Sequence, residues 1–299
     1  MKLSTPELLL EARAQLGEGP AWDAAHKRLS WVDIYAGHLH LYDPKTNLDE
    51  KIEVGAPLGC AAPTRRGNLI LGLGNGIATL SPGNAAGLKP VKLTWLAQPE
   101  SHLPGNRFND GKCGPDGRFL AGTMDNAEVE ASGALYSYSP DGTIKTLIGG
   151  VRISNGLTWS KDHKTLYYID TPTFKVMAYD YDLASGEIAN PRVAVSTPPA
   201  LGWPDGMTSD ADGRLWVAMW GGAALTVWDP ANGKLLEKIA VPAKNVTACA
   251  FGGENGTDLF VTSARKGLDT ADLTEYPLTG SLFRLQTNVT GMPTFVFDD

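Results

Sequence analysis

The stretch Asp212-Gly213-Arg214-Leu215-Trp216-Val217 joins a polar turn to a short apolar run, and sequence motifs of this kind decide the fold. Asp-Gly is a turn dipeptide, and an apolar run after it predicts a buried strand. Similar motifs recur along the whole chain at intervals of 40 to 50 residues. The first apolar residues of these motifs, which we call the apolar anchors, are Leu29, Leu69, Phe119, Leu166, Leu215 and Leu259. A regular period of this length indicates a repeat architecture.

A second motif follows each of these turns. It is a segment in which apolar and polar side chains alternate, and it often ends at Asp-Pro or Ser-Pro. Residues 39–44 (Leu-His-Leu-Tyr-Asp-Pro) and 225–230 (Leu-Thr-Val-Trp-Asp-Pro) are examples. Period-two alternation is typical of half-buried strands, and proline ends them. Six such units predict an all-β fold, a six-bladed β-propeller. A β-sandwich with accidental Asp-Gly turns is the alternative. The two motifs occur together six times at regular intervals, which argues against it.

No linker or change in composition divides the chain, so we expect a single propeller domain over residues 1–299. The ring of blades must close, and we expect strands from the N- and C-terminal ends to close it. Leu8-Leu9-Leu10 and Thr294-Phe295-Val296-Phe297 are the spare apolar segments that could share one blade.

Composition excludes several classes of function. The formal net charge of the 299-residue chain is −7, which argues against a nucleic-acid partner because phosphate binding needs a basic face. No apolar run reaches the roughly 20 residues that span a bilayer, and the first residues do not resemble a secretory signal, so we expect no membrane partner. Cys60, Cys113 and Cys249 are scattered, which is typical of reduced thiols in a cytoplasmic protein. We expect a monomer or a weak homo-oligomer.

The segments just before the apolar anchors should form the innermost strands, which line the central channel of a propeller. Four of them carry an oxygen-bearing side chain ten or eleven residues before the anchor: Glu18, Asn109, Asn155 and Asp205. Because the blades are related by rotation, these side chains should converge at one end of the channel. Two carboxylates and an amide oxygen suit a hard divalent ion such as Ca²⁺, Mg²⁺ or Mn²⁺. The alternative is that Asn-Gly and Asp-Gly merely mark turns.

Five segments resemble the signature motifs of the regucalcin (senescence marker protein)/gluconolactonase family. They read Leu16-Gly17-Glu18-Gly19-Pro20, Arg107-Phe108-Asn109-Asp110-Gly111-Lys112, Gly122-Thr123-Met124, Ser154-Asn155-Gly156-Leu157 and Pro204-Asp205-Gly206-Met207. The resemblance extends from Leu16 to Phe297 and implies a six-bladed propeller with one catalytic divalent ion. It places the metal ligands at Glu18, Asn155 and Asp205, and substrate contacts at Arg107 and Asn109.

One position departs from the pattern of that family. Its members often carry a substrate-binding glutamate shortly after Gly-Thr-Met, and direct counting puts Ala127 there. Asp125 or Glu128 could take its place, so we keep both as candidate substrate contacts.

The resemblance implies a metal-dependent lactonase that opens sugar lactones, such as gluconolactone, arabinonolactone or xylonolactone, to aldonic acids in sugar catabolism. One divalent ion (Ca, Zn, Mn, Mg or Fe) would polarise the carbonyl, and Asp205 is our candidate general base. Arg107 could donate a forked pair of hydrogen bonds to sugar hydroxyls, and Asn109 could both donate and accept. The alternatives are a promiscuous esterase or phosphotriesterase on the same metal, and a non-enzymatic calcium-binding propeller.

Overall fold

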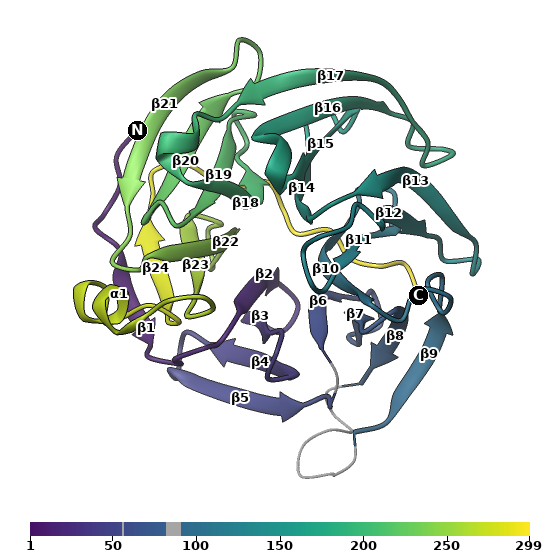
Figure 1. Cartoon of the computed structure of the whole chain (residues 1–299), viewed down its shortest axis with the longest axis horizontal. Coiled ribbons are helices and arrows are strands. Elements are labelled where there is room, and N and C mark those ends of the chain that lie inside the picture. Colours follow the sequence, from purple (N-terminus) through teal and green to yellow (C-terminus); the bar gives the residue numbers. More distant parts are fainter. Residues whose placement is uncertain (56, 82–90) are drawn as a thin grey trace.

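The computed structural model describes residues 1–55, 57–81 and 91–299. The strands in these ranges form six four-stranded antiparallel sheets, arranged as blades around a central channel (Figure 1). This confirms the prediction of a six-bladed β-propeller. Each sheet begins with an inner strand at the channel. In five blades the next three strands follow outward in chain order, whereas in blade six the N-terminal strand takes the outermost place.

The first three blades take the chain from Gly17 to Val151. Blade one consists of β2 (Gly17–Asp23), β3 (Arg28–Asp33), β4 (His38–Asp43) and β5 (Leu48–Glu53). Blade two consists of β6 (Leu58–Pro63), β7 (Leu69–Leu73), β8 (Gly76–Leu80) and β9 (Leu93–Ala97). Blade three consists of β10 (Asn106–Cys113), β11 (Phe119–Asp125), β12 (Gly133–Tyr138) and β13 (Ile144–Val151).

The remaining blades contain the short helical segments. Blade four consists of β14 (Ser154–Trp159), β15 (Thr165–Asp170), the 3-10 turn η2 (Thr171–Thr173), β16 (Lys175–Tyr181) and β17 (Ile188–Ser196). The 3-10 turn η3 (Pro199–Leu201) leads into blade five, formed by β18 (Trp203–Ser209), β19 (Leu215–Trp220), β20 (Ala224–Asp229) and β21 (Lys234–Ala240). Blade six consists of β22 (Asn245–Gly252), β23 (Asp258–Ala264), β24 (Leu282–Gln286) and β1 (Glu7–Leu10), with α1 (Thr270–Glu275) between β23 and β24.

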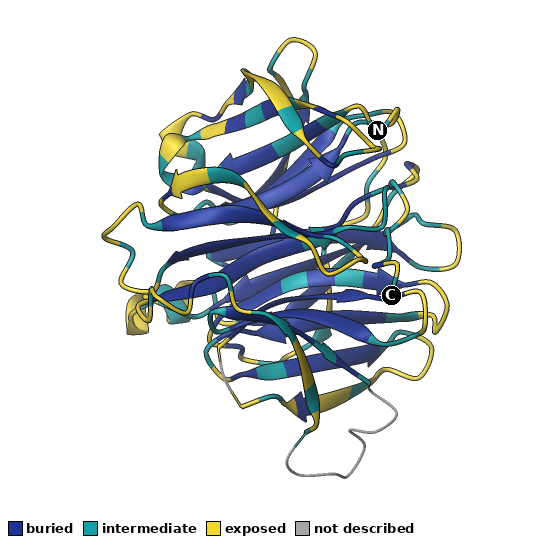
Figure 2. Ribbon diagram, turned by 90° about the vertical axis from the view of Figure 1, so that its right-hand side faces the viewer, coloured by how far each residue is buried: buried dark blue, intermediate teal, exposed yellow. Residues whose placement is uncertain are grey.

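The repeated apolar anchors account for the core. All six lie in the second strand of a blade, and none is more than 1% exposed. Their side chains pack between neighbouring blades, as Leu215 does beside Ile169 and Met207, and Leu259 does beside Trp216. Burial is therefore deepest in the inner strands and declines toward the outermost ones (Figure 2). No helix among the described residues is long and apolar enough to cross a membrane.

The N-terminal strand closes the ring, but the C-terminal segment does not share its blade. β1 pairs with β24, with Leu8 opposite Phe283. The expectation that residues 294–297 would join this blade is wrong. Phe297 instead forms a bridge with Thr64 in the loop after β6, and Met292 donates its backbone N–H to Ser209 at the end of β18. The segment thus crosses the centre of the ring (Figure 1).

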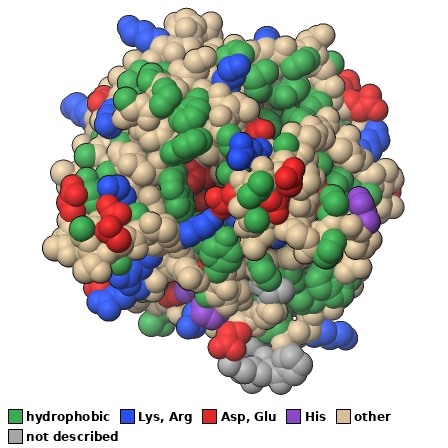
Figure 3. Space-filling view, viewed as in Figure 1, with side chains coloured by type: hydrophobic (Ala, Val, Ile, Leu, Met, Phe, Trp, Pro, Cys, Tyr) green, Lys and Arg blue, Asp and Glu red, His purple; other side chains and the backbone are tan. Residues whose placement is uncertain are grey.

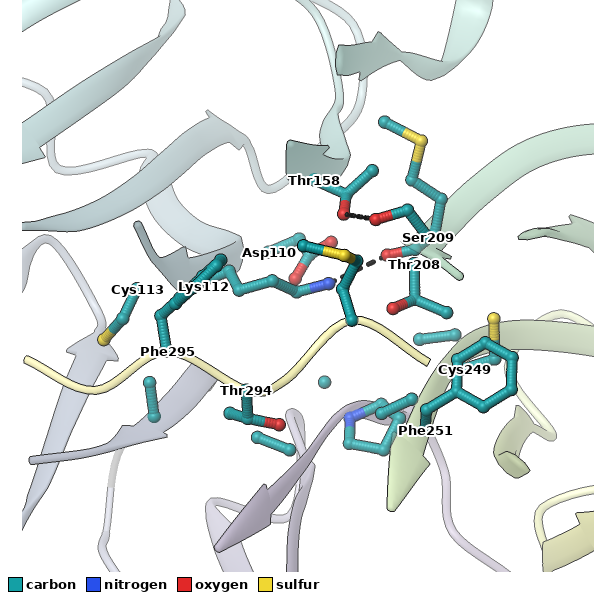
Figure 4. A pocket seen from close by; sticks show the side chains of 18 of the residues that line it. Asp110, Lys112, Cys113, Thr158, Thr208, Ser209, Cys249, Phe251, Thr294 and Phe295 are labelled. Carbon is teal, nitrogen blue, oxygen red and sulfur yellow. Dashed lines mark hydrogen bonds between the residues drawn. The ribbon is translucent and has the colours of Figure 1, made fainter. Parts of the chain in front are cut away.

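This C-terminal segment covers a small cavity inside the channel. The cavity has a volume of about 40 Å³ and is lined by the later residues of the inner strands and by residues 292–295. Figure 4 shows Lys112 reaching into it, where its Nζ donates to the backbone oxygen of Met207 at 2.9 Å. Thr158 and Ser209 share a hydroxyl hydrogen bond of 2.8 Å beside it. One end of the channel is therefore closed by the chain itself.

Candidate functional site

A larger cavity opens at the other end of the channel, where the inner strands begin. Its volume is about 480 Å³. It is lined by Leu16, Glu18, Arg107, Asn109, Met124, Glu128, Arg152, Ile153, Asn155, Thr171, Pro172, Trp203, Asp205, Trp220, Asn245, Lys266, Gly267 and Leu268. The space-filling view shows this hollow near the centre of the ring, with acidic side chains inside it and basic side chains at its border (Figure 3). The structure thus brings the predicted polar residues of four blades into one cavity.

Irregular strand pairing places these side chains. Regular pairing in β10 stops after Phe108 and resumes at Gly111, so Asn109 lies in a bulge. Asn155 and Asp205 occupy the equivalent irregularities of β14 and β18, and Glu18 lies at the edge of the one in β2. Bulges re-aim side chains and are common beside active sites. The Asn-Gly and Asp-Gly dipeptides here therefore lie within strands and are not hairpin turns.

The glycine after the functional residue allows neighbouring inner strands to approach closely. A Cβ added to Gly156 would lie 2.7 Å from the backbone oxygen of Asp205. A Cβ added to Gly206 would lie 2.5 Å from the Cβ of Ala248. Both distances are too short for a real side chain, so glycine is required for the strands to converge. This convergence brings Asn155 and Asp205 to the same end of the channel.

Glu18 and Asp205 form a buried acidic pair at the floor of the cavity. Glu18 is 5% exposed and Asp205 is 4% exposed. Burial, followed by the charge of Asp110, raises the pKa of Glu18 to about 8. Burial, followed by the charge of Glu18, raises the pKa of Asp205 well above its usual range. Ionisation of both carboxylates in this environment is unfavourable, and a cation bound between them would favour it.

The donor set fits a hard divalent cation. Within residues 1–55, 57–81 and 91–299, no side chain donates a hydrogen bond to Glu18 or Asp205. Glu18 Oε2 accepts only the backbone N–H of Gly19, at 3.1 Å. Asn155 adds a neutral amide oxygen, which accepts one hydrogen bond from Asn109 Nδ2 at 3.0 Å and keeps a second lone pair. Two carboxylates and one amide oxygen, together with space for water or substrate, match the chemistry of such an ion.

A chain of hydrogen bonds holds the amide side chains in place. Arg107 Nη1 donates to Asn109 Oδ1 at 2.7 Å, and Asn109 Nδ2 also donates to the backbone oxygen of Ser154 at 2.8 Å. Asn155 Nδ2 donates to Thr171 Oγ1 at 2.8 Å. Thr171 in turn donates to the backbone oxygen of Pro204, next to Asp205, at 2.8 Å. The chain therefore connects blades three, four and five beneath the cavity.

Thr171 lies outside the sequence motifs, although its hydroxyl accepts from Asn155 and orients that side chain. Because β14 and β15 are antiparallel, with Ser154 opposite Asp170, Thr171 comes opposite Ile153, to whose backbone oxygen it donates at 3.1 Å. Its side chain then lies within reach of Asn155 in the adjoining bulge. The pairing register of this hairpin is the signal that would have identified Thr171.

Replacing Thr171 by valine is expected to weaken divalent-metal binding about tenfold to a hundredfold, the usual cost of losing a group that orients a metal ligand. Valine keeps the shape but removes the acceptor for Asn155 Nδ2. Thr171→Ser should retain most of the affinity because the hydroxyl remains. Titration calorimetry of metal into the chelator-treated protein measures this.

Thr173→Val is the matched control, since Thr173 lies in the same turn and its hydroxyl donates only to the backbone of Asp170, at 2.7 Å. Equal losses in the Thr171 and Thr173 variants would show that the turn, and not the Asn155 contact, matters.

The loop after β11 separates the two candidates for the acidic substrate contact. Asp125 accepts backbone hydrogen bonds from Ala127, Val129 and Glu130 at 3.0 to 3.1 Å and does not line the cavity. These bonds lower the pKa of Asp125. Glu128 lies in the cavity wall, with a backbone φ of 62°. Asp125 thus organises the loop, whereas Glu128 faces the cavity.

Several other cavity residues had no signal in the sequence motifs. Lys266, from the loop after β23, forms an ion pair with Glu128. Arg152 precedes β14 and lies at the rim. Trp203, which is 46% exposed, and Trp220 supply a large aromatic surface. All of them come from loops or strand ends, so only the folded ring brings them together.

Comparisons with known proteins find relatives that match nearly the whole chain. The family model described as the SMP-30/gluconolactonase/LRE-like region matches residues 16–265. The chain is 38% identical to a regucalcin of Xenopus laevis over 284 residues, which cover 93% of each chain. It is 37% identical to the putative sugar lactone lactonase YvrE of Bacillus subtilis, over 95% of this chain and 96% of that protein. The crystal structure of a calcium-binding protein, regucalcin, from Agrobacterium tumefaciens superposes with a TM-score of 0.92 at 28% identity, covering 99% of this chain and 98% of the other.

Proposed function

Because the chain belongs to the SMP-30/gluconolactonase/LRE-like family, we propose that it is a metal-dependent lactonase that opens sugar lactones to aldonic acids. The observation that carries this proposal is the buried pair Glu18 and Asp205, which faces a polar cavity together with Asn155. These three residues would hold one divalent ion (Ca, Zn, Mn, Mg or Fe). Aldonolactones such as gluconolactone, arabinonolactone and xylonolactone are the proposed substrates.

The proposed reaction is the addition of water to the lactone carbonyl. A bound divalent ion would polarise that carbonyl. Asp205 takes a proton from the attacking water as general base, because a carboxylate at the floor of the cavity can reach a water held there. The acyl C–O bond of the ring then breaks, and the ring oxygen takes the proton held by Asp205 and leaves as a hydroxyl, which returns Asp205 to its ionised form. The new carboxylic acid loses its proton to solvent.

The cationic wall would bind the polar side of the substrate. Arg107 uses Nε and Nη1 for Asn126, Asn109 and the backbone of Phe108. Its Nη2 has no hydrogen-bond partner in the described part of the chain and can donate to a sugar hydroxyl or to the new carboxylate. Both ends of the Asn109 amide are engaged, so we assign it mainly to positioning Arg107 and Asn155. Glu128 is the proposed acceptor for sugar hydroxyls.

The aromatic side of the cavity suits the apolar faces of a sugar ring. Trp203 packs against Phe174 with ring centroids 4.5 Å apart, which holds the exposed indole in one orientation. Trp220 and Pro172 extend this apolar surface. A ligand cavity of this kind combines an apolar lining with a few placed polar groups.

We also place the protein in the cytoplasm, as a monomer or weak homo-oligomer. All three cysteines are buried and unpaired, which suits a reducing compartment.

A lactone panel with and without a chelator tests the proposal. We expect glucono-1,5-lactone to be hydrolysed by the metal-loaded protein, to lose this activity with EDTA and to regain it when a divalent ion is added. Aryl esters and a phosphotriester serve as competing substrates. Metal binding without turnover of any lactone would contradict the proposal and favour a calcium-binding propeller. A preference for the esters would favour the promiscuous hydrolase.

The metal-free protein is expected to lose stability as the pH rises from about 5 to about 8. The pKa of Glu18 rises from 4.5 in its ordinary state to about 8 in the fold, so the folded protein binds more protons than the unfolded chain in this window. Raising the pH therefore favours unfolding. Stabilisation by added metal should grow over the same window, because the ligands must be deprotonated. Thermal unfolding with EDTA or with metal, between pH 5 and 8.5, measures both trends.

Glu18→Gln is the control for this pH dependence, because it removes one of the two titrating carboxylates and should reduce the slope, while Asp205, whose pKa is also raised, keeps part of it. Carboxylates whose pKa is lowered, such as Asp125, titrate below this window. A metal-free protein that becomes more stable toward pH 8 would contradict the expectation.

A further inference from the structure

The charges around the cavity do not balance once the metal ligands are set aside. Arg107, Arg152 and Lys266 line the wall, and Glu128 is the single carboxylate in that lining besides Glu18 and Asp205. In the proposed function, Glu18 and Asp205 are compensated by a divalent ion. Arg152 is exposed and interacts with the charge of Asp170, which lies outside this lining. The less exposed part of the wall then carries Arg107 and Lys266 against Glu128, an excess of one positive charge that a neutral sugar lactone would leave uncompensated.

Lys266 is held in the wall from several directions. Its backbone N–H donates to Gln15 at 2.9 Å, and its backbone oxygen accepts from Asn245 Nδ2 at 3.0 Å. Its Nζ lies 5.4 Å from the centroid of the Tyr35 ring and forms an ion pair with Glu128. The side chain is only 29% exposed. The ammonium group is thus presented to the cavity by fixed backbone and is not a freely moving surface charge.

Arg107 shares the same aromatic ring. Its Cζ lies 5.4 Å from the Tyr35 centroid, so Tyr35 supports two cations in one part of the wall. Aromatic rings attract cations, which offsets part of the repulsion between them. Two cations on one wall form a site for carboxylate oxygens, which accept charge-assisted hydrogen bonds from both guanidinium and ammonium groups.

Building on the proposed lactonase function, we propose that the cavity prefers lactones carrying an additional carboxylate, and that Lys266 is the residue that recognises this group. In the absence of substrate, the carboxylate of Glu128 forms an ion pair with the ammonium group of Lys266. A substrate carboxylate competes with Glu128 for the ammonium group, whereas a hydroxymethyl group at the same position cannot. Charge complementarity of this kind also accelerates encounter with an anionic substrate.

Binding of two sugar acids tests this preference without relying on turnover. Gluconate and glucarate differ only at C6, where glucarate has a second carboxylate. Titration calorimetry with the metal-loaded protein at low ionic strength should give about tenfold tighter binding of glucarate, equivalent to one charge-assisted contact. Lys266→Met should remove most of this difference, so that the affinities for the two acids come within about twofold of each other. Lys266→Arg should keep the preference, and Glu128→Gln should strengthen it.

Lys244→Met is the matched control. Lys244 pairs with Asp272 at 2.9 Å and lies 5.8 Å from the Tyr276 centroid, so it makes the same kinds of contact outside the cavity. This variant should keep the wild-type preference. Lys266→Gln is measured in parallel with Lys266→Met, and thermal unfolding confirms that both are folded.

Equal binding of the two acids by the wild type would overturn the inference, as would equal losses for both acids in the Lys266 variants. Lactone hydrolysis separates this result from failure of the proposed function. Metal-dependent opening of gluconolactone without a glucarate preference would leave the lactonase and remove the inference about Lys266. A Lys266-dependent glucarate preference without hydrolysis of any lactone would support the carboxylate site and remove the lactonase.

Discussion

Replacing Asp205 by asparagine is expected to lower kcat/KM for sugar lactones by at least about a thousandfold. A general base contributes about a hundredfold to ten-thousandfold, and a lost metal-ligand charge adds to this. Asparagine keeps the size of the side chain but cannot accept the proton of the attacking water. Steady-state assays at saturating metal measure the loss, so that weaker metal binding does not contribute.

The same change should not destabilise the metal-free protein. Burial and the charge of Glu18 both raise the pKa of Asp205, so its ionised form is unfavourable in the fold. Removing that charge relieves repulsion on Glu18, and the thermal midpoint at pH 8 with EDTA should stay equal or rise. Asp212→Asn is the matched control, because Asp212 is on the loop after β18 and its side chain is 70% exposed. Near-normal turnover by metal-loaded Asp205→Asn would show that another group is the base.

The fold was predictable because each blade repeats the same local signals. A turn dipeptide, the apolar run after it and the alternating strand can each be recognised from neighbouring residues alone. The period at which they recur gives the number of blades. The same counting also placed Glu18, Asn109, Asn155 and Asp205 on equivalent positions, and the structure brings them together in one cavity. Rotational repetition converts a spacing in the sequence into a position in space.

The rest of the site depends on which blades become neighbours in space. Lys266 reaches Glu128 from a loop 138 residues away in the sequence. The sequence around either residue contains no motif that predicts this contact. Thr171 acts through a hairpin register and a strand irregularity, which composition does not specify. Residues 294–297 illustrate the same limit. The run Thr-Phe-Val-Phe is apolar enough for a strand, but the blade it might have joined is completed by β1.

Arg107→Ala is expected to lower kcat/KM for gluconolactone by about tenfold to a hundredfold, since a charge-assisted hydrogen bond to substrate contributes about 1.5–3 kcal/mol. Hydrolysis of δ-valerolactone should fall less, because that lactone has no hydroxyls for the guanidinium to bind. Metal affinity should change little, since Asn109 keeps its bonds to the backbone of Ser154 and to Asn155. Comparing the two substrates therefore separates recognition of the sugar from damage to the site.

Arg192→Ala is the matched control for this comparison, because Arg192 pairs with Asp180 at 2.7 Å on the exposed outer part of blade four. It should behave as wild type with both lactones. If Arg107→Ala lowers both activities equally while the protein remains folded and metal-loaded, Arg107 stabilises the charge that develops on the reacting carbonyl and does not read the hydroxyls. If neither activity changes, Arg107 makes no contact with substrate, and its bond to Asn109 at 2.7 Å serves the fold alone.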